Sequence, residues 1–154
     1  MTIFALDTNI ISYLLKQDQQ VISKMKEVAK LNHDCVIPPV AFYEVKRGLL
    51  AVNSTKQLQL LEKMVDEFPV GEMSLAAWDE AAKLYAVHRQ RGNVIEDADL
   101  FIAAFCLTGN HTLVTNNIKH FEMIEGLICT NWKQELETKD RISPDTRIVF
   151  PVKK

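Results

Sequence analysis

The chain has 154 residues, of which 47% are hydrophobic and 25% charged, and its formal net charge is -2. This length and mix are typical of one soluble globular domain. There is no overall basic excess, so any contact with nucleic acid must come from a local cluster of cations. Three cysteines lie far apart without a C-x-x-C pair, which argues against a disulfide framework or a zinc site and fits a reducing cytosol.

The chain shows no signal for secretion or membrane insertion. Its start, MTIFALDTN, has no basic region followed by a long apolar stretch, so we expect no signal peptide. No apolar run reaches the ~18 residues that a membrane-spanning helix needs. We therefore expect a cytoplasmic protein without a membrane partner.

In its first half the chain alternates short apolar strands with helices. The expected elements are a strand over 2–6, a helix over 10–16, a helix over 21–31, a strand over 35–37, a helix over 40–50 and a helix over 55–66. Asp7, Thr8 and Asn9 are good N-cap residues for the first helix. Pro38 and Pro39 suit the first turn of the third helix.

The second half continues the alternation. The expected elements are a weak strand over 68–70, a helix over 76–91, an apolar helix over 97–107, a strand over 112–115, a short turn or helix over 117–121 and a last strand over 126–130. Gly92-Asn93 and Gly109-Asn110 are expected to end the two helices. Such alternation predicts βαβ units, and therefore an α/β fold with a parallel sheet and helices on both faces. The charged residues 133–154 are interpreted as a tail or arm, either ordered on the domain or a partner, or loose.

Three acidic residues stand where the chemistry of a metal site is expected. Asp7 ends the first strand, Glu44 lies one or two turns into the helix after the second strand, and Asp99 begins the apolar helix. Ligands bind at this edge of open parallel sheets. Carboxylates ~5 Å apart repel by roughly 3 kcal/mol at an effective dielectric of about 20, so such a cluster calls for a cation. Oxygen ligands favour Mg²⁺, with Mn²⁺ as a substitute, and such an ion orients a phosphate and activates water.

Taken singly, each acid has a plainer interpretation. Asp7 and Asp99 are also good N-caps, and a glutamate such as Glu44 is usually on a solvated helix face. Thr8 and Asn9 either cap the helix or bond to Asp7 or a metal-bound water. The candidate phosphate contacts are Lys46, Arg47, Arg89, Arg91, Lys119 and His120, each of which is otherwise a surface charge.

Four strings carry a resemblance to a known family. ALDTNIISYLL, PPVAFYEVKRGL, IEDADLFIAAFC and LVTNNIKHFEMIEGLICTNW resemble the motifs of PIN domains, in order, from Ile3 to Trp132. The pattern is most similar to the VapC toxins of bacterial toxin–antitoxin pairs. The resemblance implies a three-layer α/β/α PIN-like domain over residues 1–132 with a central parallel β-sheet, and a tail over 133–154.

The resemblance also implies an activity and partners. It implies a Mg²⁺-dependent endoribonuclease that uses Asp7, Glu44 and Asp99 as catalytic and metal-binding residues, on a structured RNA such as a tRNA or ribosomal RNA. It implies homodimerisation and inhibition by a VapB-type antitoxin. The alternatives are a housekeeping PIN nuclease without antitoxin and a non-catalytic PIN module that binds RNA or protein. A haloacid-dehalogenase phosphatase is disfavoured because that chemistry needs a second Asp where Asn9 stands.

One position departs from the family pattern. Many PIN domains carry a fourth acid in the closing motif, where this chain has Asn117. An amide can ligate through oxygen but adds no charge. Glu96 and Asp97 are placed to compensate in part, although acidic residues are also common at a helix N-terminus without any such role.

Overall fold

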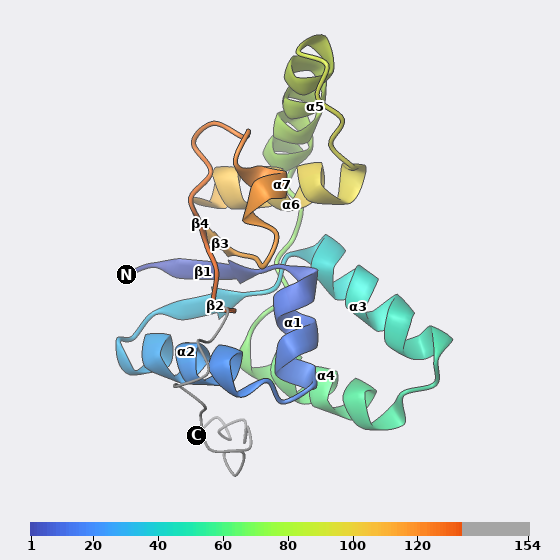
Figure 1. Ribbon diagram of the computed structural model, residues 1–154, viewed down its shortest axis with the longest axis vertical. Helices are drawn as coiled ribbons and strands as arrows, with labels where there is room; N and C mark the ends of the chain where they lie inside the picture. Colours follow the sequence, from blue (N-terminus) through green and yellow to red (C-terminus); the bar gives the residue numbers. More distant parts are fainter. Residues whose placement is uncertain (134–154) are drawn as a thin grey trace.

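A computed structural model describes residues 1–133. Four strands, β1 (Ile3–Leu6), β2 (Asp34–Val36), β3 (Thr112–Val114) and β4 (Cys129–Thr130), form one parallel sheet in the order β2-β1-β3-β4. Figure 1 shows helices above and below these strands in this view. The predicted α/β fold with a central parallel sheet is confirmed. The predicted tail over 133–154 lies outside the described residues except for Lys133.

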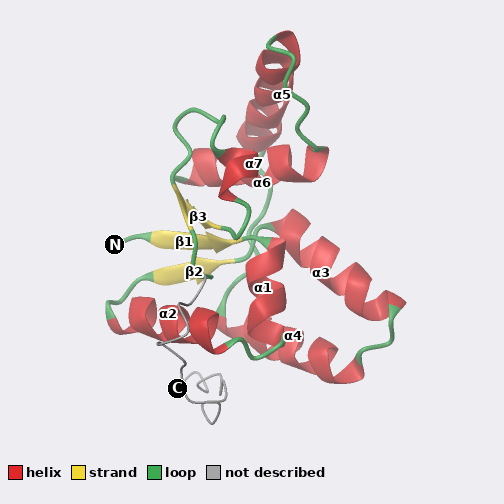
Figure 2. Ribbon diagram, viewed as in Figure 1, coloured by secondary structure: helices red, strands yellow, loops and turns green. Residues whose placement is uncertain are grey.

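Seven helices are described in this part of the chain, and they flank the sheet (Figure 2). They are α1 (Thr8–Leu15), α2 (Gln19–Lys30), α3 (Pro39–Ala51), α4 (Thr55–Glu67), α5 (Leu75–Gln90), α6 (Asp97–Gly109) and α7 (Ile118–Phe121). The sequence predicted each of them to within a few residues. None of them is both long and apolar enough to cross a membrane.

The helix ends form where the sequence supplies their caps. Asp7 accepts the backbone N–H of Thr8 at the start of α1, and Asp18 accepts those of Gln20 and Val21 at the start of α2. Asn110 ends α6 in the left-handed region, at φ 55°. These groups satisfy backbone donors and acceptors that a helix leaves unpaired at its ends.

Two predicted strands were wrong in part. Residues 68–70 form only an isolated bridge between Ile37 and Val70, because Pro69 has no N–H with which to extend a ladder. The last strand is reduced to Cys129–Thr130. Gly126 adopts φ +82°, which is incompatible with an extended strand, so residue 126 belongs to a turn.

The core lies between the sheet and its helices. Leu6, Ile10, Leu100, Ile102 and Leu113 are among its fully buried side chains. From β1 the chain passes to β2 on one side, and it later returns to place β3 on the other side of β1. The carboxyl ends of β1 and β3 therefore meet at a topological switch point, where open α/β sheets form their ligand crevices.

Candidate active site

Asp7 lies at this switch point, directly after β1, and is 5% exposed. Its Oδ1 accepts the backbone N–H of Thr8 at 2.8 Å. Its Oδ2 accepts the Thr115 hydroxyl at 2.7 Å and the Asn9 amide at 3.3 Å. Three neutral donors therefore orient this carboxyl group from two neighbouring strand ends.

Thr8 joins the second acid to the first. Its hydroxyl donates to Glu44 Oε1 at 2.9 Å, while its backbone N–H donates to Asp7. Glu44 reaches this position from the second turn of α3, and its Oε2 lies 3.8 Å from an Arg47 guanidinium nitrogen. Thr8 and Asn9 thus both contact Asp7, as the sequence suggested, and the N-cap of α1 is Asp7 itself.

Asp99 enters from the first turn of α6 and is partly exposed. Its Oδ2 lies 3.5 Å from Nδ1 of His120 in α7. The sequence suggested His120 only as a phosphate contact and not as a partner of Asp99, because α6 and α7 become neighbours only in the folded chain.

The electrostatics show that the three acids act on one another. Burial raises the pKa of Asp7, with a further rise from the charge of Glu44, although hydrogen bonds from Thr115, Thr8 and Asn9 lower it. Burial also raises the pKa of Asp99, and the charges of Asp7, Glu96 and Glu44 add to that rise against His120. The site therefore concentrates negative charge in a partly desolvated place.

The donor set suits a hard cation, since it consists of carboxylate oxygens, and the contacts shown for Asp7 come from neutral donors. Within residues 1–133, however, no three or more His, Cys, Asp or Glu side chains already stand close enough together to hold a metal ion. Glu44 is instead turned to Thr8 and Arg47, and Asp99 to His120. Metal binding by the three acids thus requires side-chain rotation and stays a prediction.

The accessory acids and amide occupy the margin of the site. Glu96 is the exposed N-cap of α6 and makes no side-chain cap bond, but its charge acts on Asp99. Asp97 is exposed in the first helical turn, as an ordinary helix N-terminal acid is. Asn117 is exposed, and its backbone N–H donates to the Thr115 hydroxyl at 3.0 Å, so it lies one contact from Asp7.

The predicted cations separate into two groups. Arg47 contacts Glu44 and therefore lies at the margin of the site, whereas Lys119 is exposed on α7, one residue before His120. Lys46 lies about 200° around α3 from Glu44, with its Nζ over the Phe42 ring. Arg91 caps the C-terminal end of α5, which projects far from the sheet in Figure 1. The structure therefore does not bring Lys46 and Arg91 to the acids.

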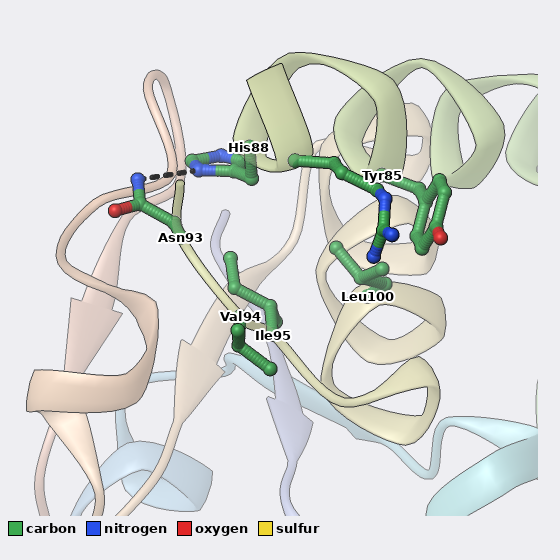
Figure 3. A pocket seen from close by; sticks show the side chains of 7 residues that line it. Tyr85, His88, Asn93, Val94, Ile95 and Leu100 are labelled. Carbon is green, nitrogen blue, oxygen red and sulfur yellow. Dashed lines mark hydrogen bonds between the residues drawn. The ribbon is translucent and has the colours of Figure 1, made fainter. Parts of the chain in front are cut away.

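Two hollows lie apart from the acidic residues. Figure 3 shows one between α5, the following loop and α6, with His88 bonded to Asn93 at 3.3 Å. Its volume of about 50 Å³ is too small for an organic ligand. The other, of about 410 Å³, lies between α3 and α4, where Phe42 and Lys46 face Leu61 and Val65. Neither contains a residue of the acidic site.

Comparison with known proteins agrees with this fold. The chain belongs to the PIN domain family, whose profile matches residues 4–126. It is 30% identical over 131 residues to ribonuclease VapC2 of Rickettsia felis, covering 84% of this chain and 98% of that one.

Two solved structures share the fold. The VapBC2 structure from Rickettsia felis, bound to a promoter DNA fragment, contains a chain that matches with a TM-score of 0.78 and 29% identity, covering 86% of this chain and 100% of that one. VapBC-1 from nontypeable Haemophilus influenzae matches with a TM-score of 0.76 and 28% identity, covering 85% and 98%. The predicted resemblance to PIN domains of the VapC kind is confirmed.

The raised pKa values predict how stability depends on pH. In the folded chain Asp7 and Asp99 titrate above their ordinary value of 3.8, so the folded state holds these protons more tightly than the unfolded state. Their contribution to stability is therefore largest at low pH and falls as pH rises from about 3.8 through the folded pKa values. Thermal melts in chelator, compared between the native chain and Asp7→Asn, should show the variant gaining relative stability across this window. A constant difference between the two melting curves at all pH values would contradict this.

Proposed function

We propose that this PIN-domain chain is a Mg²⁺-dependent endoribonuclease and the toxin of a type II toxin–antitoxin pair. Its substrate would be structured RNA, such as a tRNA or ribosomal RNA in the cytoplasm, in which it hydrolyses phosphodiester bonds. The observation that supports the proposal is that three acids from separate elements of a PIN fold influence one another. Asp7 and Glu44 both accept hydrogen bonds from Thr8, and the charges of Asp7 and Glu44 raise the pKa of Asp99.

In this proposal each residue near the site has a stated task. Asp7, Glu44 and Asp99 hold Mg²⁺, or Mn²⁺ in its place. The bound ion supplies Lewis-acid stabilisation and a more acidic water as nucleophile. Thr8 already donates hydrogen bonds to Asp7 and Glu44, and it holds their two carboxyl groups in a fixed relative position. Arg47 and Lys119 offset the negative field for an incoming phosphate.

The partner assignment rests on the relatives. The Rickettsia felis and Haemophilus influenzae proteins are named as members of VapBC complexes. By analogy we propose a VapB-type antitoxin as partner of this chain, and a homodimer as its assembly. A housekeeping nuclease without antitoxin would share the same site, whereas a non-catalytic module would have no need of all three acids.

The test is a cleavage assay on purified transfer and ribosomal RNA. We expect discrete fragments with Mg²⁺, no fragments with chelator, and recovery with Mn²⁺. Induced expression should arrest growth, and co-expression of a small gene directly upstream should relieve the arrest. The absence of discrete, metal-dependent cleavage would refute the nuclease. Cleavage without growth arrest and without a small upstream gene would favour the housekeeping alternative.

A further inference from the structure

Helix α3 presents three different faces. Ala41 and Val45 are buried against the domain, and Phe42 and Lys46 line the hollow toward α4. The remaining face carries Tyr43, Glu44, Arg47 and Gly48, which span about 140° at about 100° per residue. We call these four residues the α3 strip. The α3 strip therefore contains the candidate metal ligand Glu44 and lies on the open side of the helix.

Tyr43 and Arg47 form a stacked pair within the α3 strip. Tyr43 is 59% exposed, and the Arg47 guanidinium carbon lies 5.0 Å from its ring centroid. Arg47 is at the same time 3.8 Å from Glu44. An exposed aromatic ring that is joined to a cation is a suitable surface for a nucleobase, because bases stack on aromatic rings and on guanidinium planes alike.

Gly48 adds an independent observation. It lies within α3, one turn after Glu44, although glycine is less favourable than alanine inside a helix. A Cβ at this position would meet nothing within 4 Å, and its φ is not positive, so neither packing nor backbone geometry within the described chain requires glycine. Close approach of an external backbone is one of the uses of glycine, and the open space at Gly48 is compatible with it.

We propose that the α3 strip binds an unpaired nucleotide next to the bond that is cut, an inference that rests on the proposed nuclease function. The base stacks on Tyr43 and Arg47, and the sugar–phosphate backbone passes over Gly48. Bases inside a duplex do not expose their faces, so the α3 strip selects loops and single-stranded segments over paired ones. Arg47 provides positive charge beside an acidic cluster that would otherwise repel phosphate.

A protein partner is the alternative to a nucleotide as the ligand of the α3 strip. Leu50, which is 54% exposed, lies on the Tyr43 side of α3 and would extend an apolar contact. The nucleotide fits the α3 strip better, because the strip combines an aromatic ring with a cation next to the candidate catalytic residue Glu44. A protein contact at Tyr43 is therefore one of the outcomes that the experiment must detect.

The experiment measures binding separately from cleavage, in the Asp99→Asn background. A stem–loop RNA with 2-aminopurine in its loop serves as probe, because stacking quenches its fluorescence. We expect Tyr43→Leu to abolish the quenching and to raise Kd by roughly 5- to 150-fold, which is the range of one lost base–aromatic stack. Tyr43→Phe should retain both signals. Gly48→Ala should weaken binding while the melting temperature rises, which separates this effect from misfolding.

Tyr85 and Arg89 on α5 provide a matched control. Arg89 lies 5.9 Å from the Tyr85 ring centroid, and Tyr85 is 47% exposed, so the pair has the same chemistry on another element. Tyr85→Leu should leave RNA affinity unchanged.

Equal affinity for Tyr43→Leu, Gly48→Ala and the background protein would overturn the proposal while leaving the nuclease intact. Sedimentation that shows Tyr43→Leu dissociating a dimer would assign the α3 strip to a protein contact and overturn it as well. Failure of the background protein to bind any RNA would remove the proposed function itself.

Discussion

Asp7→Asn or Asp99→Asn should lower RNA cleavage by roughly 10³-fold or more while the protein remains folded. The loss corresponds to several kcal/mol of transition-state stabilisation by a correctly held metal ion, at about 1.4 kcal/mol for each tenfold change. The melting temperature in chelator should stay level or rise, because each substitution removes one of several carboxylates that destabilise one another by repulsion. Single-turnover cleavage and thermal melts on the same preparations measure both effects.

The control for this pair is Asp79→Asn, an exposed acid on α5. It removes the same charge from the chain outside the acidic site, and we expect normal cleavage. Cleavage by Asp7→Asn or Asp99→Asn at the native rate, with matched Mg²⁺, would place the catalytic site elsewhere. A lowered melting temperature together with lost cleavage would indicate that the carboxylate is structural.

Thr115→Val should reduce metal affinity and catalytic efficiency by about 10- to 100-fold, the usual effect of losing a group that orients a metal ligand. Thr115 is fully buried, and valine matches its shape. The substitution removes the hydroxyl that donates to Asp7 Oδ2 at 2.7 Å and accepts the N–H of Asn117 at 3.0 Å. We expect a loss of stability of about 1 kcal/mol, because hydrogen bonds are lost without a cavity.

Thr115→Ser separates orientation from packing, because it restores the hydroxyl and removes only a methyl group. Calorimetric titration with Mn²⁺ should show the serine variant close to the native chain and the valine variant well below it. Serine and valine variants that are equally weak would show that Thr115 acts through its methyl group. Native metal affinity in the valine variant would show that the orientation of Asp7 does not depend on the Thr115 hydroxyl.

The sequence predicted the parts of the site that local pattern can carry. Asp7 was predicted because it follows a strand, and Asp99 because it begins an apolar helix, and both signals are local in the sequence. Thr115 was missed because nothing within TLVT distinguishes it from any other strand threonine, and its contact with Asp7 spans 108 residues. The sequence signal for Thr115 was its position at the end of the predicted strand over 112–115, the strand that lies next to β1 in the structure.

Helical periodicity separates two of the predicted cations on α3. Arg47 is three residues after Glu44 and shares its face, whereas Lys46 is two residues after it and points elsewhere. The contact of His120 with Asp99 depends on how α7 lies against α6, which no spacing rule supplies. Strand length failed for a local reason, since Pro69 and Gly126 override apolar composition at their positions.

The pairing of β1 with β3 has a consequence for the timing of synthesis. Asp7 leaves the ribosome first, and the Thr115 that orients it follows 108 residues later. Closing a loop of that length costs an entropy that only the completed sheet offsets. A nascent or prematurely terminated chain that ends before β3 carries all three acids but cannot hold Asp7 in its final orientation. Competence for chemistry would thus arise only near the end of translation, so that incomplete products are inert.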